Sequence, residues 1–382
     1  MKNLFLFCIL LVFLAAFYTF SSGKTLAAPP VKKSRFIHRQ GAALVVGKKE
    51  KVWLKGVSFG NEVWTNNPVP VTHHTKEDFR RVAAMGMNTV RFYLNYLTFE
   101  DNHAPYTYKQ SGWDWLNQNI AWAKKNNIYL ILNIHVPPGG FQSNGQGGAL
   151  WNNPENQKRL KALWHNIAKR YAQEPTIVGY DLLNEPVVTQ SIRQWQQLAQ
   201  QLADTIRQAD TNHLLIVERL NAVNNNWNNV NADQNFFLIN DPNTLYTFHF
   251  YLPFTYTHQH ATWAKMGDGG KYPDETHREQ KNLVRNKAYL AHQLEQFLAF
   301  GRKNNVPLYL GEFGLIKNCF EPGKGGIQWV SDMVDLLKQH QVHFTYHVYH
   351  EDNFGIYAGY GKPVDPAKAN FPLIDLFKQK LK

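Results

Sequence analysis

The sequence predicts an α/β fold in which eight parallel strands alternate with helices and close into a (β/α)8 TIM barrel, preceded by a short N-terminal β-hairpin. Short runs of β-branched and aromatic residues recur along the chain, each followed by a loop and an amphipathic stretch of helical period. These runs are continuously apolar, which is typical of a parallel sheet covered by helices. An open doubly wound sheet would show a glycine-rich phosphate turn after its first strand, and the sequence has none.

The elements are expected in the following order. A hairpin is predicted over Phe36–Leu54, where apolar residues alternate around two glycines. The strands are predicted at Trp53–Phe59, Asn88–Tyr93, Ile128–His135, Ile177–Leu183, His213–Val217, Leu245–Tyr251, Pro307–Glu312 and His343–Tyr346. The helices are predicted at Lys76–Met85, Trp113–Asn126, Pro154–Tyr171, Ser191–Ala209, Lys281–Asn304 and Gly326–Gln339. The asparagine-rich segment Asn221–Asn235 has the composition of a loop with many turns. No linker divides the chain, so residues 29–382 are expected to form a single barrel domain.

Residues 1–28 are expected to lie outside the barrel as a signal peptide. Lys2 provides a positive start, Leu4–Phe20 is an almost unbroken apolar run, and small residues follow up to Ala27 and Ala28. This pattern is typical of an export signal, with cleavage expected near Ala27 or Ala28. The apolar run exceeds the ~7–15 residues usual in such signals, so an uncleaved N-terminal membrane anchor is the alternative. In both cases the protein would be secreted or held at the cell envelope.

Charge and cysteine content limit the expected partners. The 41 Lys+Arg and 29 Asp+Glu give a net charge of +12, and losing Lys2 and Lys24 with the leader removes two of these charges and leaves +10. Because the basic residues are scattered, we expect no nucleic-acid surface, and at most contact with an acidic envelope. Cys8 lies in the leader, so Cys319 is the only cysteine of the remaining chain and is expected to be a packed side chain. We expect a monomer with no internal disulfide.

Polar residues end several of the predicted strands. In a (β/α)8 barrel, the carboxyl ends of the strands meet at one rim, and the functional residues of such barrels lie there. The predicted strand ends hold Arg91, His135, Asn184, Glu185, Glu218, His249, Tyr251 and Glu312. One such residue alone would be explained as a loop contact. Several residues converging on one rim indicate a functional site.

Two carboxylates at this rim are the candidate catalytic pair. Glu185 is followed by Pro186, which ends its strand, and Glu312 lies between Gly311 and Gly314, where backbone and ligand can approach closely. The two glutamates are 127 positions apart, so they can meet only across the barrel mouth. Glycoside hydrolysis requires two carboxyl groups of opposed protonation, one acid for the leaving oxygen and one nucleophile or base. A structural ion pair or a metal site is the alternative.

Five short motifs make the sequence similar to a known enzyme family. They are Asn88-Thr-Val-Arg91-Phe, Asn133-Ile-His135, Leu183-Asn184-Glu185-Pro186, His249-Phe-Tyr251 and Gly311-Glu312-Phe-Gly314. In this order, and at about these strands, they resemble glycoside hydrolase family 5 (cellulase family A), the retaining cellulase and mannanase family of the (β/α)8 clan. The similarity extends from the first predicted strand to the last.

The resemblance implies a role for each carboxylate. Glu185 would be the acid/base and must keep its proton near neutral pH, which apolar and anionic surroundings would favour. Glu312 would be the nucleophile that forms a glycosyl-enzyme intermediate, held as the carboxylate by Arg91 and Tyr251. The carboxyl groups of retaining enzymes are about 5–5.5 Å apart, and that separation is expected here.

The resemblance also implies substrate contacts. Asn184 would hydrogen-bond the sugar 2-hydroxyl, and His135 and His249 would line the central subsite. The role of Glu218 stays open between a substrate contact and a structural residue. Candidates for stacking against sugar rings, with loop packing as the alternative, lie in predicted loops above the barrel mouth: Trp64, Trp151 and Trp263.

Two departures from the family pattern bear on the substrate. The tryptophan that usually ends the eighth strand is absent, and Tyr346, His347 or Tyr349 is expected to take its place. The family's asparagine after the first strand is replaced within Gly56-Val-Ser58-Phe. These changes leave the reaction intact and concern which sugar is accepted.

No metal or cofactor is expected. The His258-Gln-His260 pair follows the sixth predicted strand, whereas metal-dependent barrel hydrolases carry such a pair at the first, so we interpret it as a loop feature. The sequence has no phosphate-binding glycine loop, serine elbow or Cys-x-x-Cys motif.

The leading hypothesis is therefore an exported retaining endo-β-glycosidase that hydrolyses β-linked polysaccharide by double displacement, first of all an endo-β-1,4-glucanase of the cellulase type. Within the same family, a β-mannanase, an exo-β-1,3-glucanase and a glycolipid-directed glycosidase stay open. A carbohydrate-binding surface protein is the non-enzymatic alternative, although a binder needs neither carboxylate. A metal-dependent hydrolase is the third, and it would lose activity on chelation.

Overall fold

The structure is a computed structural model, and it describes residues 36–47, 50–65, 73–227, 235–351, 353–359 and 363–382. The described residues belong to one compact unit. The expected signal peptide, residues 1–28, lies outside the described residues, as does the part of the asparagine-rich segment from 228 to 234. Within the described part of the chain, no helix has both the length and the apolar character needed to cross a membrane.

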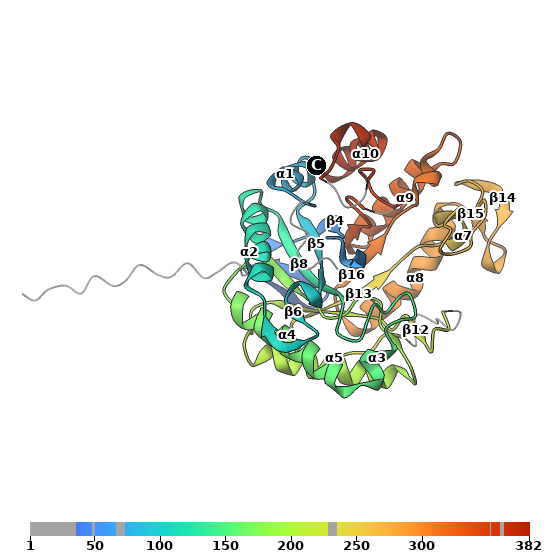
Figure 1. Cartoon of the computed structure of the whole chain (residues 1–382). Helices are drawn as coiled ribbons and strands as arrows, with labels where there is room; N and C mark the ends of the chain where they lie inside the picture. The colour runs from blue at the N-terminus through green and yellow to red at the C-terminus, as the bar shows by residue number, and fades with distance from the viewer. Residues whose placement is uncertain (1–35, 48–49, 66–72, 228–234, 352, 360–362) are drawn as a thin grey trace, which may run out of the picture. The chain divides into compact units, whose positions relative to one another are not determined.

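Eight parallel strands close into a barrel, in sequence order around the ring (Figure 1). They are β4 (Lys55–Phe59), β5 (Thr89–Asn95), β8 (Tyr129–Val136), β9 (Ile177–Asp181), β11 (Leu214–Glu218), β13 (Thr244–His249), β16 (Leu308–Phe313) and β17 (His343–Tyr346). The last strand pairs with the first, with Tyr346 beside Val57, so the barrel has no edge. Their residues are almost all buried, as continuously apolar runs require. The predicted (β/α)8 barrel is confirmed.

Helices cover the outside of the barrel (Figure 1). They are α1 (Lys76–Ala84), α2 (Gln110–Lys125), α4 (Pro154–Tyr171), α5 (Ile192–Arg207), α8 (Lys287–Asn304), α9 (Gly326–Gln339) and α10 (Phe371–Leu381). Six of them match the predicted helices. The sequence prediction omitted α10, although Asn370 caps its first turn and Pro372 stands at its start.

The predicted start of α8 was wrong. The helix was expected from Lys281 but begins at Lys287, because the preceding residues form a small antiparallel ribbon of β14 (Asp274–Arg278) and β15 (Val284–Arg285). The side chain of Asn286 then accepts two main-chain N–H groups of the first helical turn, which satisfies donors that a helix start leaves unpaired.

Three tryptophans attach helices to the barrel. Trp164 of α4, Trp195 of α5 and Trp329 of α9 are fully buried. Their indole N–H groups donate to main-chain carbonyls near the carboxyl ends of strands, at Leu182 (3.0 Å), Glu218 (2.7 Å) and Leu252 (3.2 Å). Each ring therefore buries a large apolar surface and fixes one loop of the rim at which the strands end.

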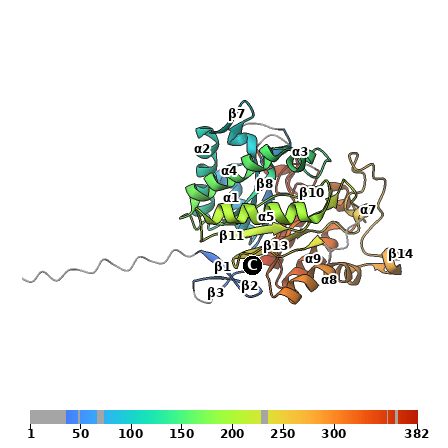
Figure 2. The same cartoon turned by 90° about the horizontal axis from the view of Figure 1, so that it is seen from below.

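The amino-terminal end of the barrel is closed by the predicted hairpin, which has a third strand. β1 (Ile37–Gln40), β2 (Ala43–Val46) and β3 (Glu50–Lys51) form an antiparallel sheet at this end (Figure 2). Ile37 and Leu44 pack into the same core cluster as residues of β8, β9, β11, β13 and β16. The bottom of the barrel is thus plugged by apolar side chains.

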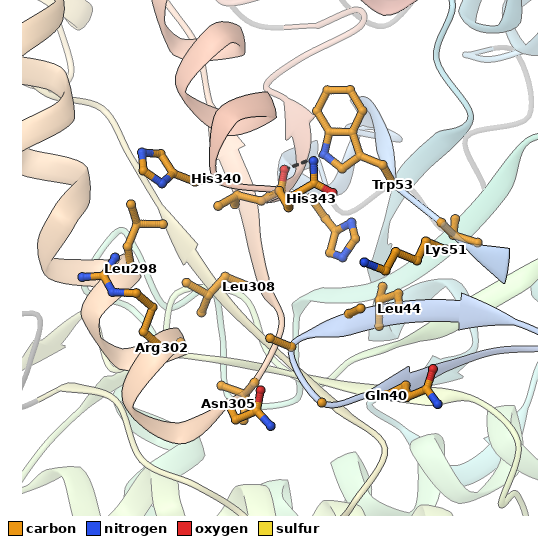
Figure 3. A pocket seen from close by; sticks show the side chains of 18 residues that line it. Gln40, Leu44, Lys51, Trp53, Leu298, Arg302, Asn305, Leu308, His340 and His343 are labelled. Atoms are coloured by element: carbon orange, nitrogen blue, oxygen red, sulfur yellow. Dashed lines mark hydrogen bonds between the residues drawn. The ribbon is translucent and has the colours of Figure 1, made fainter. Parts of the chain in front are cut away.

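A cavity of about 960 Å³ lies beside this sheet (Figure 3). It is lined by the β1–β2 turn, the end of α8 and the starts of β16 and β17, with Trp53 bonded to the carbonyl of Val342 (2.8 Å). It lies at the opposite end of the barrel from the predicted catalytic carboxylates.

Candidate active site

A cleft of about 1200 Å³ lies over the carboxyl ends of the barrel strands. Eight residues predicted from the sequence line it: His135, Asn184, Glu185, Tyr251, Glu312, His347, Trp64 and Trp263. Aromatic residues that the prediction did not include also line it: Tyr96, Phe141, Trp227 and Phe354. The strand-end residues therefore do converge on one rim, under a cleft lined by many aromatic side chains.

Glu312 is buried at the end of β16 and its carboxylate is held by three donors. Its Oε1 accepts hydrogen bonds from Arg91 Nη1 (2.6 Å) and from the hydroxyl of Tyr93 (2.6 Å). Its Oε2 accepts one from the hydroxyl of Tyr251 (2.9 Å). Burial alone would raise the pKa of Glu312, but the positive charges of His249 and other neighbours hold it well below the usual range. The group is therefore an ionised carboxylate at neutral pH.

Arg91 lies beneath the cleft and ties three barrel strands together. It is completely buried, and its Nε donates to Asp181 Oδ2 (2.7 Å) while its Nη2 donates to Asn184 Oδ1 (2.9 Å). Burial would lower the pKa of Arg91, but Asp181 and Glu312 raise it well above the usual value. The guanidinium thus holds Glu312 and orients Asn184. Arg91 was expected at the rim as the group that holds Glu312; it contacts Glu312 as expected, but it does not itself line the cleft and so is not placed to contact substrate.

Glu185 follows the end of β9 in an unusual backbone conformation. Its φ is 44°, in the left-handed region that non-glycine residues rarely adopt. Its main-chain N–H donates to Glu218 Oε2 (2.9 Å), and the hydroxyl of Ser143 donates to its own Oε2. The side chain of Glu185 is 18% exposed, against 7% for Glu312. Of the two carboxyl groups, Glu185 is the more accessible to a leaving group and to water.

His249 lies between the two carboxyl groups. Its Nδ1 is 2.9 Å from Glu185 Oε1 and 3.6 Å from Glu312 Oε2. Burial would lower the pKa of His249, but Glu218, Glu312 and Glu185 together raise it to about 9. His249 was predicted to line the central subsite; it is buried behind the carboxylates and does not line the cleft.

The two carboxyl groups face each other at short range. One oxygen of Glu185 and one of Glu312 lie within 4.8 Å of each other and of a ring nitrogen of His249. This is close to the ~5–5.5 Å of retaining glycosidases and well below the ~6.5–9.5 Å of inverting ones, which need room for a water.

The same three side chains are the one metal-ligand-like group found among the described residues. Two observations oppose a cation there. Arg91 already places a guanidinium 2.6 Å from Glu312, and the raised pKa of His249, about 9, favours its protonated form, which has no lone pair to offer. The arrangement fits a pair of carboxyl groups separated by cationic donors better than a metal centre.

Of the three residues expected to replace the missing eighth-strand tryptophan, His347 is the one that lines the cleft. Its Nδ1 is 3.1 Å from the hydroxyl of Tyr93, and it lines the cleft next to Glu312. The prediction that Tyr346 contacts substrate was wrong, because successive residues of a strand point to opposite faces and Tyr346 packs outward on Phe377 of α10. Tyr349 also points away, and its hydroxyl donates to Asp78 of α1 (2.8 Å).

Of the other aromatic residues that were predicted to contact substrate, some line the cleft and one does not. His135 stacks on Tyr93, with ring centroids 3.9 Å apart, and Trp64 meets His135 edge-on. Trp263 is 54% exposed on the cleft. The prediction for Trp151 was wrong: it is buried, and its indole N–H donates to Gln142 Oε1 (2.8 Å) away from the cleft.

Three residues that complete the site were missed. The hydroxyl of Tyr93 bonds Glu312, the carboxylate of Asp181 bonds Arg91, and the hydroxyl of Ser143 bonds Glu185. A tyrosine or an aspartate within a barrel strand carries no local signal of its partner, although Tyr93 lies two positions after Arg91 and therefore on the same strand face. Trp227 was missed because only the composition of its asparagine-rich segment was used.

Two residues that were interpreted as a packed side chain and as a loop feature are both buried. Cys319 is buried, and burial raises the pKa of its thiol to about 12. His258 lines the cleft and stacks on Phe254 (4.0 Å between centroids). Burial lowers the pKa of His258 to about 3, which keeps its ring neutral.

A (β/α)8 barrel with two facing carboxyl groups under an aromatic cleft defines the class of glycoside hydrolases. The family model described as Cellulase (glycosyl hydrolase family 5) matches residues 46–353. Endoglucanase C of Acetivibrio thermocellus is 30% identical over 318 residues, which cover 78% of this chain and 90% of that protein. Cellodextrinase A of Ruminococcus flavefaciens is 25% identical over 305 residues, covering 77% and 84%. The chain belongs to glycosyl hydrolase family 5.

A solved structure shares the fold. The crystal structure of endoglucanase Cel5A from Thermotoga maritima matches with a TM-score of 0.67 and 24% sequence identity, covering 85% of this chain and 96% of that one. The agreement extends over nearly all of the barrel. The likeness shows that the two chains share the (β/α)8 fold.

Proposed function

We propose that this protein is a retaining endo-β-1,4-glucanase in which Glu312 is the nucleophile and Glu185 the acid/base. The observation that carries the assignment is the contrast between two facing carboxyl groups. Glu312 accepts bonds from Arg91, Tyr93 and Tyr251, which stabilise its ionised form. Glu185 is more exposed, as a group that meets both a leaving oxygen and a water must be.

In the first step, Glu312 attacks the anomeric carbon and forms a glycosyl-enzyme ester. At the same time Glu185 gives its proton to the glycosidic oxygen, so the bond to the leaving sugar breaks and the leaving group departs as an alcohol. In the second step Glu185, now ionised, takes a proton from a water that attacks the same carbon. The ester bond breaks, Glu312 is released as the carboxylate, and the anomeric configuration is retained.

Neighbouring groups of the site support both steps. Arg91 holds the Oδ1 of Asn184, which leaves the amide N–H groups of Asn184 to donate, from the cleft wall, to the sugar 2-hydroxyl. That contact strengthens as the ring gains oxocarbenium character. Arg91, Tyr93 and Tyr251 also stabilise the carboxylate as it leaves in the second step.

A polymeric β-1,4-glucan is the proposed substrate. The relatives named endoglucanase C and cellodextrinase A support a glucan, and the name of the first supports endo action. Trp64, Trp227 and Trp263 all line this cleft, where indole faces can stack on the apolar faces of pyranose rings. His347, smaller than the tryptophan of the family pattern, is the residue most directly placed to alter the sugar preference.

The test is a panel of soluble polysaccharides with sizing of the products. We expect carboxymethyl cellulose and mixed-linkage β-glucan to be cut into a range of oligosaccharides, with viscosity falling before reducing ends accumulate. If β-mannan or β-1,3-glucan is shortened and the β-1,4-glucans are not, the glucanase assignment fails within the same family. A Glu312→Ala variant that binds oligosaccharide without turnover is the control for a pure binder.

We also propose export through residues 1–28. The apolar run Leu4–Phe20 and the small residues that follow support it. Expression of the full chain in a bacterial host should yield extracytoplasmic protein whose first residue lies near Ala27 or Ala28. Recovery of the intact N-terminus in the membrane fraction would favour the anchor, and cytoplasmic protein with an intact N-terminus would contradict export.

A further inference from the structure

A third carboxyl group, Glu218, lies behind the proposed catalytic pair. It is the last residue of β11 and is fully buried. Its Oε2 accepts the main-chain N–H of Glu185 (2.9 Å), and its Oε1 accepts from Asn221 Nδ2 (3.0 Å). Its own carbonyl accepts the indole N–H of Trp195 (2.7 Å). Hydrogen bonds thus fix both the side chain and the main-chain carbonyl of Glu218. Glu218 does not line the cleft, so it is not a substrate contact.

The bond from Glu185 to Glu218 depends on the backbone of Glu185. A φ of 44° in a residue other than glycine persists only where its surroundings hold it. A main-chain N–H aimed at a buried carboxylate is a strong, charge-assisted bond of the kind that can do so. Glu218 therefore anchors the turn that presents the side chain of Glu185 to the cleft.

A second connection runs through His249. Its Nδ1 is 2.9 Å from Glu185 Oε1, and its Nε2 is 3.6 Å from Glu218 Oε2. Both ring nitrogens face carboxyl groups, so only the doubly protonated ring can offer a proton to each. A change in the protonation of Glu218 therefore changes the electrostatic potential at Glu185, both directly through space and through the ring of His249.

The charges around Glu218 come from several strands. They are Glu185 and Asp181 near the end of β9, His249 on β13, Arg91 on β5 and the adjacent Arg219. Burial raises the pKa of Glu218 to about 7, His249 opposes the shift and Glu185 adds to it. His249, whose pKa is raised to about 9, faces Glu218 across 3.6 Å, so the charge on one group affects the protonation of the other.

We propose that Glu218 is a positioning residue for Glu185, which fixes the main chain of the acid/base and, with His249, controls how firmly the site keeps the catalytic proton. The proposal rests on the acid/base role given to Glu185. A negative charge at Glu218 favours the protonated form of a neighbouring carboxyl group and of His249. Removing that charge should let His249, which bonds Glu185, lose its proton at lower pH.

The test compares Glu218→Gln with wild type. Glutamine keeps an acceptor for the N–H of Glu185 and removes the charge. We expect the alkaline limb of the pH profile of kcat to move to lower pH by about 0.5–1 unit, with KM changed less than about twofold. A uniform loss of kcat with an unmoved pH profile would overturn the proposal, because a residue that only supports the fold has no reason to move one limb.

A matched control exists at the other end of the same strand. Asp210 is a buried carboxyl group that contacts the ring of His213 and accepts the hydroxyl proton of Tyr180 (2.7 Å), far from the cleft. Asp210→Asn should lower stability and leave both limbs of the profile in place. If Asp210→Asn moves the alkaline limb as far as Glu218→Gln does, the effect is not specific to Glu218 and the proposal fails.

A second readout does not depend on activity. NMR titration of the His249 ring, assigned with a His249→Gln variant, should show the ring deprotonating at lower pH in Glu218→Gln than in wild type. An unmoved titration would overturn the link through His249, even in an active enzyme. If the titration moves while no polysaccharide is cut by wild type, the proposed function fails and the coupling stands. Should Glu218→Gln not fold, Asn221→Ala, which removes one donor to the ionised carboxylate of Glu218 and so weakens its negative charge, should move the same titration to lower pH.

Discussion

Arg91 Nη1 lies 2.6 Å from Glu312 Oε1, although the two residues are 221 positions apart and their strands are separated in the barrel by β17 and β4. The same guanidinium bonds Asp181 and Asn184. One buried arginine therefore connects the proposed nucleophile, the cleft wall and the strand that leads to the proposed acid/base. Closure of the barrel is what brings these groups together, so the fold and the chemistry depend on the same contact.

Replacing Arg91 by lysine should lower kcat by about 10–100-fold and lower Tm. Lysine keeps a charge but cannot offer the planar set of donors that bonds three partners at once. Steady-state kinetics and thermal unfolding measure the two effects. Arg159→Lys is the control, because Arg159 is also buried and pairs with a carboxylate, Glu100 (3.1 Å), outside the catalytic group. Equal losses of kcat in both variants would contradict a catalytic effect of Arg91.

Removing the hydroxyl of Tyr93 should shift the acidic limb of the pH profile. The hydroxyl donates to ionised Glu312 at 2.6 Å, and hydrogen bonds of this kind lower the pKa of a carboxyl group. In Tyr93→Phe the pKa of Glu312 should rise, so activity should be lost at higher pH as the solution is acidified. We expect kcat to fall about tenfold at the optimum. An acidic limb that stays in place would show that Tyr93 does not stabilise the carboxylate.

Chelation should leave the enzyme active. Double displacement needs two carboxyl groups, and the two carboxyl groups of the possible metal site lie here beside Arg91 and the cationic form of His249, which is the third member of that site. Dialysis against EDTA should change kcat/KM less than about twofold, and adding divalent cations should not increase it. Loss of activity that Zn²⁺ or Ca²⁺ restores would support a metal-dependent hydrolase instead.

Trp263→Ala should weaken action on polymers more than on short substrates. Trp263 is 54% exposed on the cleft, so its loss removes a stacking surface without opening the core. We expect KM for soluble β-glucan to rise about three- to tenfold, with little change for a short aryl glycoside. Phe371→Ala, at a similar exposure of 55% on α10, is the control and should change neither. An equal rise of KM in Phe371→Ala would contradict a sugar-binding subsite at Trp263.

The positions of Glu185 and Glu312 could be predicted because each ends an apolar run, and a barrel brings strand ends together whatever the register. What depends on register or on distant partners could not be predicted. Tyr346 and His347 are neighbours of similar character, and only the pairing of β17 shows that the first points to α10 and the second to the cleft. Asp181 looks in the sequence like any polar residue before a turn. Its purpose depends on Arg91, which lies 90 positions earlier.

The central claim is that Glu312 forms a covalent bond to the sugar, and trapping with a 2-deoxy-2-fluoro glycoside tests it most directly. The fluorine slows both steps, and an activated leaving group lets the first occur, so the ester accumulates. Peptide mass mapping should find one sugar per protein, on the peptide that contains Glu312, and none in Glu312→Ala. A label on Glu185 or another residue, or no label together with products of inverted configuration, would contradict the account.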